Sequence, residues 1–191
     1  MAKKPDDQAL NGAIISVVED VFRQLCHTEF SAEPVAVEKD VIEYDGRMRI
    51  FPMEKFNAPA YVAVVTYHLS QKQLEAVDPV GTVILYVKED MIEKFFKAFG
   101  HSVSEAEDEG KCLDVIGQLC DIIAGNLKNQ LGSMGLADLV LSTSSKHKNA
   151  IPEGVPFDYS LFKKQELSFS FWKEKCIVIE VCLGNIPAKG R

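Results

Sequence analysis

The sequence predicts an α+β domain in which an antiparallel sheet packs against about three main helices. Stretches with helical spacing of apolar residues are followed by runs rich in β-branched and aromatic residues. The unit of a helix followed by paired strands occurs roughly twice along the chain. With 191 residues, 47% of them hydrophobic, the chain is long enough for one well-packed core. We therefore expect a single domain over residues 1–191, with short loose termini.

The first predicted element is an amphipathic helix over residues 8–26, which needs a sheet or a second helix to cover its apolar face. That face carries Leu10, Ile14, Val17, Val18, Val21 and Leu25. Residues 31–49 have a mixed, polar pattern. Within them, Asp45-Gly46 is a turn signal that predicts a junction between two short strands.

Two strands are predicted in the middle of the chain, over residues 60–68 and 81–87, because both runs are rich in β-branched and aromatic side chains. Between them, residues 69–79 are largely polar and predict a short turn of helix. Residues 89–99 have phenylalanines at helical spacing and are followed by Gly100, which predicts a helix that ends there.

The second half opens with a predicted helix over residues 110–130, whose end is marked by Gly132 and Gly135. The acidic run 105–109 precedes this helix and complements its N-terminal dipole. Residues 136–141 predict a strand, and residues 142–156 a loop rich in Ser, Lys, Asn and Pro. The alternating run 167–171, a turn at 173–175 and the run 176–183 predict a closing hairpin, followed by a loose tail over 187–191.

Composition excludes several classes of function. A formal net charge of −7 argues against a nucleic-acid surface, which needs clustered Lys and Arg. No apolar run approaches the length of a membrane span, and the first residues lack the apolar core of a signal peptide. We therefore expect a cytoplasmic protein that binds neither nucleic acid nor a membrane.

The cysteines and histidines do not form a metal-binding pattern. The five cysteines are odd in number and contain no Cys-x-x-Cys pair, so we expect reduced and mostly buried thiols. The four histidines are scattered among different predicted elements. Glycine-rich nucleotide motifs and the Gly-x-Ser-x-Gly motif of serine hydrolases are also absent from the sequence.

One predicted helical stretch, residues 115–128, places an amide and a carboxylate on the same side of an otherwise apolar helix. Because residues three or four apart share a face, Gln118, Asp121, Gly125 and Lys128 form a polar stripe. The opposite, inward-facing stripe consists of Ile116, Leu119, Cys120, Ile123 and Leu127. Such a polar pair also occurs on many ordinary solvated helices, and Gly125 is explained equally well by close packing of a neighbouring element.

This stretch resembles the motif helix of the CheC and CheX chemotaxis phosphatase family, in its CheX-like branch. In that family a Glu-x-x-Asn pair is closely followed by an apolar turn and a Gly-Asn. Residues 118–126 read Gln-Leu-Cys-Asp-Ile-Ile-Ala-Gly-Asn, so residues 123–126 fit the second part as they stand. The resemblance extends over most of the chain, from the first helix to the final hairpin.

The resemblance implies a phosphatase that acts on a phosphorylated CheY-like response regulator and hydrolyses the acyl phosphate on its aspartate. The regulator supplies its own magnesium ion, so no cofactor of this chain is expected. Because an acyl phosphate is already reactive, the phosphatase mainly has to orient a water molecule in line with the phosphorus. A carboxamide can do this because it offers a donor and an acceptor together. The acidic residue of the family pair holds a lysine of the regulator.

In this chain the two groups have exchanged places, because Gln118 and Asp121 stand where the family has Glu and Asn. One outcome is that Gln118 orients the water while Asp121 binds the lysine. The other is that catalysis is lost and binding retained.

Three functions follow from these observations. The first is a phosphatase with Gln118 and Asp121 as catalytic residues, and with Gly125 and Lys128 joining them in partner binding. The second is a module that binds a regulator without hydrolysis. The third is a component of the flagellar switch, to which relatives in the wider family belong. A homodimer paired through sheet edges is also expected from the resemblance, since the chain offers several short β-branched strands.

Overall fold

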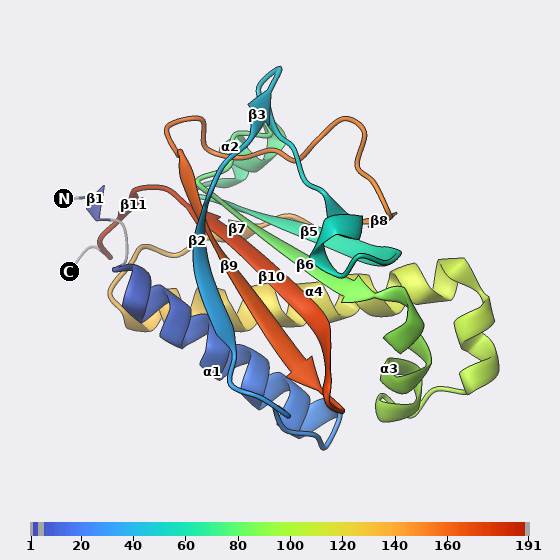
Figure 1. The fold of residues 1–191 in the computed structure, drawn as a ribbon. Helices are drawn as coiled ribbons and strands as arrows, with labels where there is room; N and C mark the ends of the chain where they lie inside the picture. Colours follow the sequence, from blue (N-terminus) through green and yellow to red (C-terminus); the bar gives the residue numbers. More distant parts are fainter. Residues whose placement is uncertain (1, 4–5, 190–191) are drawn as a thin grey trace.

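The fold is built on a seven-stranded antiparallel sheet (Figure 1). The computed structural model describes residues 2–3 and 6–189. The strand order is β2–β9–β10–β6–β5, and both β7 and β8 pair with β5 at the far edge. These strands span β2 Val35–Asp40, β5 Ala60–His68, β6 Gly81–Lys88, β7 Val140–Leu141, β8 Ser145–Lys148, β9 Lys163–Phe171 and β10 Glu174–Leu183.

Two short strand pairs lie outside this sheet. The first joins β3 (Glu43–Tyr44) to β4 (Arg47–Met48) through Asp45 and Gly46, which both have positive φ, as a two-residue hairpin turn requires. This confirms the turn predicted from Asp45-Gly46. The second pair joins β1 (Ala2–Lys3) to β11 (Ile186–Pro187).

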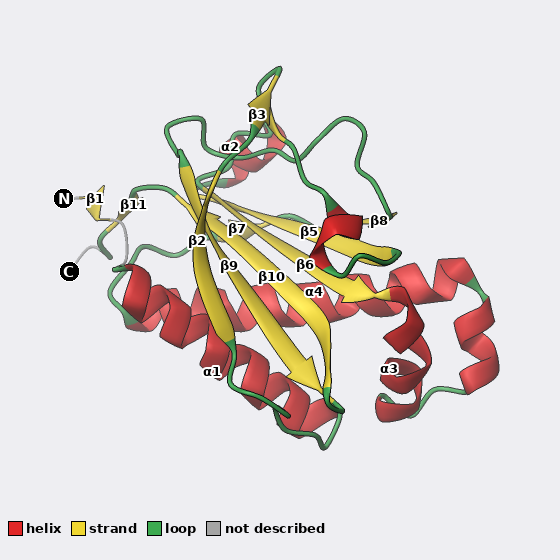
Figure 2. Ribbon diagram, in the orientation of Figure 1, coloured by secondary structure: helices red, strands yellow, loops and turns green. Residues whose placement is uncertain are grey.

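Two long helices cover one face of the sheet (Figure 2). They are α1 (Asp7–Leu25) and α4 (Glu109–Ser133), and the shorter helices are α2 (Gln71–Glu75) and α3 (Ile92–Ala98). The side chain of Asp108 caps α4 by accepting hydrogen bonds from the N–H groups of Gly110 (2.8 Å) and Lys111 (3.2 Å). The prediction of an α+β fold with an antiparallel sheet and about three main helices is confirmed.

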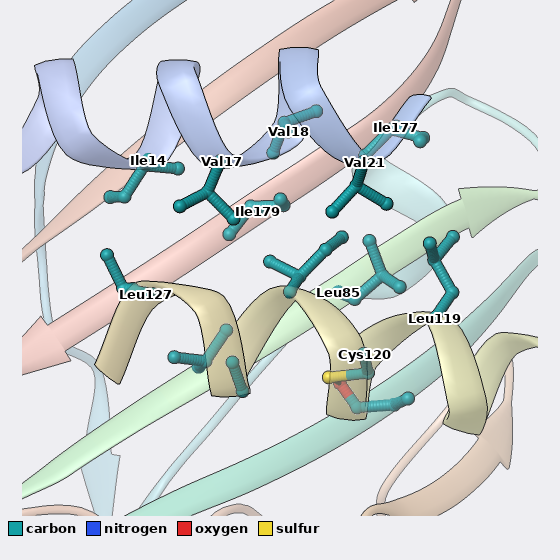
Figure 3. Packing of buried hydrophobic residues seen from close by; sticks show 14 of the residues in the cluster. Ile14, Val17, Val18, Val21, Leu85, Leu119, Cys120, Leu127, Ile177 and Ile179 are labelled. Carbon is teal, nitrogen blue, oxygen red and sulfur yellow. Dashed lines mark hydrogen bonds between the residues drawn. The ribbon is translucent and has the colours of Figure 1, made fainter. Parts of the chain in front are cut away.

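The main core lies between the sheet and these two helices. Figure 3 shows Val17 and Val21 of α1 facing Leu119 and Leu127 of α4, with Ile179 of β10 in the space between them. All of these side chains are buried. The apolar periodicity of both helices therefore has the expected cause, since each helix has one side against the sheet and the other helix.

A smaller core lies on the opposite face of the sheet, beneath the segments 41–58 and 149–162. It contains a buried ionic cluster as well as apolar side chains. The Lys55 ammonium lies 2.5 Å from a carboxylate oxygen of Glu166 and 2.5 Å from one of Glu180, and Tyr86 donates its hydroxyl to Glu180 (2.6 Å). Lys164 also lies 2.9 Å from Glu180. The carboxylates and the Tyr86 hydroxyl thus have polar partners despite their burial.

The structure corrects the sequence interpretation at the sheet edges. Residues 35–40 form the edge strand β2. The sequence did not predict this strand, because all six side chains are exposed and show no alternation of apolar and polar residues. Residues 145–148 form β8, within the segment 142–156 that was predicted as a loop. The strand predicted over 136–141 is reduced to Val140–Leu141.

The ends of the described chain also differ from the expected loose termini. Besides the β1–β11 pair, the backbone N–H of Lys189 donates to the carbonyl of Gly135 (2.8 Å), and Leu136 forms a β-bridge with Ala188. These backbone contacts tie the tail to the end of α4. The last part of the predicted tail, residues 190–191, lies outside the described residues, as do residues 1 and 4–5 at the N-terminus.

Candidate functional site

Helix α4 carries the predicted site on the side turned away from the core. Gln118 and Asp121 are exposed, whereas the five apolar residues predicted to face inward are all buried. They are Ile116, Leu119, Cys120, Ile123 and Leu127. The two stripes predicted for this helix are therefore present.

Asp121 is held by the segment that joins β7 to β8. Its Oδ1 accepts a hydrogen bond from the backbone N–H of Ser144 (3.1 Å), and its Oδ2 accepts one from the Ser144 hydroxyl (3.0 Å). A carboxylate has room for about four such bonds, so further acceptor positions are left on Asp121. The arrangement fixes the direction of the carboxylate.

Strand β8, which follows Ser144, runs along α4, and its alternate residues Lys146 and Lys148 form ion pairs with the helix. The ammonium of Lys146 lies 2.5 Å from Asp114, and that of Lys148 lies 2.9 Å from Glu109. Hydrogen bonds to the carboxylates of Glu89 and Glu109 raise the pKa of Lys148 above its ordinary value. We call residues 144–148 the β8 arm. It lies between the sheet edge and the outer face of the helix.

Gly117 allows the β8 arm to approach. A Cβ atom at this position would lie 2.5 Å from Cδ of Lys146 and 3.0 Å from Oγ of Ser144. Any larger side chain at Gly117 would therefore push on the residue that holds Asp121. The close approach that was considered for Gly125 occurs at Gly117 instead.

Gln118 lies on the exposed side of α4 that faces the ends of α1 and α3, not the β8 arm. It lines a hollow of about 210 Å³ between the end of α1, the segment after α3, and α4. No hydrogen bond joins its amide to another residue within 2–3 and 6–189. Its donor and acceptor are therefore available to a partner.

The remaining predicted residues of the polar stripe lie one and two turns further along α4. Gly125 is half-buried, and apart from its chain neighbours and the backbone of its own helix, no described residue lies within 4 Å of the position that a Cβ atom would take there. Lys128 is half-buried as well, and it forms no ion pair with any residue that the structure describes. Both leave space for another molecule, and their role in partner binding stays a prediction.

Metal and thiol chemistry find no support at this site. Within residues 2–3 and 6–189, no group of three or more His, Cys, Asp and Glu side chains is placed to hold a metal ion. All five cysteines are free and buried, as predicted. Burial raises the pKa of the Cys120 thiol, which makes it a weak nucleophile.

No described helix is long and apolar enough to cross a membrane.

Sequence reasoning missed the residues that surround Gln118 and Asp121. Ser144 is 23 residues from Asp121 and fell in a predicted loop, although the alternation of Ser144, Lys146 and Lys148 is a weak strand signal. The exposed side chains of Leu25, the last residue of α1, and of His101, which follows α3, also line the hollow beside Gln118. Their approach to Gln118 depends on how the helices pack, which periodicity does not reveal.

Comparison with solved structures identifies the architecture. A CheC-like superfamily protein from Shewanella sp. PV-4 is similar with a TM-score of 0.60 at 15% identity, over 93% of this chain and 98% of that one. The chain has the CheC/CheX fold. The CheX chain of a CheX–CheY–BeF3–Mg2+ complex from Borrelia burgdorferi is similar with a TM-score of 0.53 at 13% identity, over 94% and 96% of the two chains.

The same fold also occurs in FliY. FliY from Thermotoga maritima is similar with a TM-score of 0.57 at 10% identity, over 98% of this chain and 92% of that chain. No protein-family model matches the sequence, and no curated protein matches it. The resemblance noted in the sequence is thus confirmed at the level of the CheC/CheX fold.

Proposed function

We propose that this protein binds a phosphorylated CheY-like response regulator through the outer face of α4 and hydrolyses its aspartyl phosphate. The observation that carries the proposal is the exposed pair Gln118 and Asp121 on α4. It gains support from the CheC/CheX fold, in which the relative from Borrelia burgdorferi forms a complex with CheY. A regulator as partner also implies the cytoplasm as the place of action.

In this proposal Gln118 orients the attacking water. Its carboxamide has no internal partner, so the oxygen can accept from the water while the nitrogen donates to a phosphoryl oxygen. The regulator's own magnesium ion balances the charge of the phosphoryl group. Asp121 uses the acceptor positions that Ser144 leaves free to bind a lysine of the regulator.

Binding without hydrolysis is the second candidate, and the hydrogen bonds from Ser144 to Asp121 favour it. Asp121 stands where the family has the water-orienting Asn, and here that position is engaged by the protein itself. For hydrolysis, Gln118 would have to reach the in-line water from a position one helical turn before the family's Asn, which also favours binding alone. The partner in this case is a regulator or, given the fold shared with FliY, a component of the flagellar switch.

The test uses CheY-like receivers from the same genome, phosphorylated with acetyl phosphate and Mg2+, and follows phosphate loss with and without this protein. We expect acceleration by the wild type and a loss of at least about tenfold in Gln118→Ala, the scale of removing one positioned polar group. Asp121→Ala should weaken binding. Asn129→Ala, an exposed change on the same helix, is the matched control.

The outcomes separate the candidates. Binding of the phosphorylated receiver without acceleration excludes hydrolysis and leaves the binding module. Full acceleration by both variants shows that the reaction uses other residues. Co-purification with switch proteins, and not with receivers, favours the flagellar role.

We further propose that two copies pair through β2. Among the strands that the structure describes, β2 pairs with β9 alone, so its outer backbone groups are open to a second strand.

A further inference from the structure

Two hollows lie at the C-terminal ends of α1 and α3, and Gln118 of α4 lines the first of them. The first is the apolar hollow, lined by Leu25, Phe99, His101, Val115, Gln118, Leu119 and Ile122. The second is the basic hollow, of about 460 Å³, lined by Cys26, His27, Lys94, Lys97, Ala98 and Trp172. Leu25 and Phe99 line the first hollow and their chain neighbours Cys26 and Ala98 line the second, so both hollows involve the same two helix ends.

The apolar hollow has two partly exposed aliphatic side chains in its lining. Leu25 is 38% exposed and Ile122 is 40% exposed, and both lie next to the exposed amide of Gln118. Its volume of about 210 Å³ is below the range of about 300–1,000 Å³ for small-molecule sites. A single apolar side chain from a protein partner fits such a space better than a metabolite does.

The basic hollow contributes the positive charge of two lysines. Lys94 and Lys97 form no ion pair with a carboxylate in the described part of the chain, and no carboxylate lines this hollow there. The Lys94 ammonium lies 5.9 Å from the centre of the Trp172 ring.

Glu105, which contacts the lining residue His101, is already paired. Glu105 lies 3.0 Å from the ammonium of Lys111 and 3.7 Å from the ring of His101. The hydrogen bond from Lys111 lowers the pKa of Glu105, together with one from the backbone of Ser102. The basic hollow can therefore meet an anionic group of a partner, while Asp121 beside Gln118 can meet a cationic one.

We propose that both hollows form the docking surface for the phosphorylated regulator, which inserts an apolar side chain beside Gln118 and places an acidic flank over Lys94 and Lys97. This rests on the proposed function, and it specifies how the partner is recognised. Acidic side chains of the partner, outside its phosphorylation site, would complement the two lysines. The apolar contact supplies burial, and the lysines speed the encounter.

The test measures association and dissociation rates with a CheY-like receiver of the same genome, loaded with beryllofluoride and Mg2+, at several salt concentrations. We expect Ile122→Ser and Leu25→Ser to weaken binding about fivefold to tenfold through faster dissociation. Met134→Ser is the matched control, because Met134 lies at the end of the same helix and is 42% exposed. All three sites are partly exposed, so the variants should remain folded.

For the charges, we expect Lys94→Glu combined with Lys97→Glu to slow association about tenfold at low salt and to reduce its salt dependence. Lys72→Glu on α2 is the control, since Lys72 is exposed and far from both hollows. Unchanged rates in the Ile122, Leu25 and lysine variants, with wild-type binding and phosphate release intact, would overturn this inference and leave the proposed function standing.

Two further outcomes are informative. If the wild type binds no receiver, both the inference and the proposed function fail. If Ile122→Ser converts a dimer into a monomer in light scattering while receiver binding is unchanged, a second copy of this chain covers the apolar hollow and the inference is overturned.

Discussion

Ser144 donates two hydrogen bonds to Asp121, one from its backbone N–H and one from its hydroxyl. The two residues belong to different layers of the fold, because Asp121 lies on α4 and Ser144 precedes the edge strand β8. The contact therefore couples the candidate site to the edge of the sheet. In the proposed function Ser144 is a positioning residue, which directs Asp121 without touching the partner.

Replacing Ser144→Ala should affect binding more than stability. The backbone donor remains and the lost hydrogen bond is exposed, so we expect the free energy of unfolding to fall by no more than about 1 kcal/mol in urea titrations. Regulator affinity should fall about twofold to fivefold as Asp121 gains freedom. Ser145→Ala is the control, because the Ser145 hydroxyl bonds to no described residue. Equal affinities of the two variants would contradict a positioning role.

Two glycines of α4 should respond oppositely to alanine. Gly125 has open space at its Cβ position, so Gly125→Ala should raise the free energy of unfolding by about 0.5–1 kcal/mol, the usual gain inside a helix. Gly117→Ala should not raise the free energy of unfolding in this way, because its Cβ atom would collide with Lys146 and Ser144. Denaturant unfolding should place Gly117→Ala at least about 1 kcal/mol below Gly125→Ala. An equal rise in the free energy of unfolding at both positions would show that the β8 arm moves aside without an energetic cost.

The Gly125→Ala variant also tests the predicted role of Gly125 in binding. If a regulator approaches the helix closely there, affinity should fall although stability rises. Unchanged affinity would restrict the contact to Gln118, Asp121 and their surroundings.

Helix α4 could be predicted from the sequence because its cause is local. The spacing of Ile116, Leu119 and Ile123 records which side meets the sheet, and the polar stripe follows from what remains. The hairpin of β9 and β10 is equally local, since its strands are joined by a short turn. The same reasoning placed Gln118 and Asp121 on the exposed side.

The contacts around the site could not be predicted because they join distant segments. The β8 arm carries the polar composition of a loop, and it becomes a strand through pairing with β5 and ion pairs to Asp114 and Glu109. The same limit applies to Lys55, whose partner Glu180 is 125 residues away. Strand β2 is exposed on both faces, so it lacks the alternation that marks half-buried strands.

The ionic cluster beneath residues 41–58 predicts acid sensitivity. Burial alone would raise the pKa of Glu166, but hydrogen bonds from Lys39 and Lys55 outweigh it and lower the pKa from 4.5 to about 2. Because the folded-state pKa lies below the unfolded one, this stabilisation is complete above about pH 5 and is lost as the pH falls toward 2. Urea unfolding between pH 7 and pH 3 should show this decline.

Glu166→Gln should remove that part of the pH dependence and cost on the order of 2 kcal/mol at pH 7, where the carboxylate is ionised. Glu38→Gln is the control, because Glu38 is 45% exposed and lies 3.9 Å from Lys163. An identical pH profile for wild type and Glu166→Gln would show that other groups cause the acid response.

The open edge of β2 predicts the oligomeric state. Val35 and Val37 lie on the same face of this strand and are 58% and 45% exposed, so they add apolar surface to the free backbone edge. If two copies pair there, light scattering should give twice the 21.2 kDa of one chain. Val35→Lys combined with Val37→Lys should shift the protein to a monomer, because charge on an edge opposes strand pairing. Val77→Lys, at a 54% exposed valine after α2, should leave the dimer intact, and a dimer that survives the double change must use another surface.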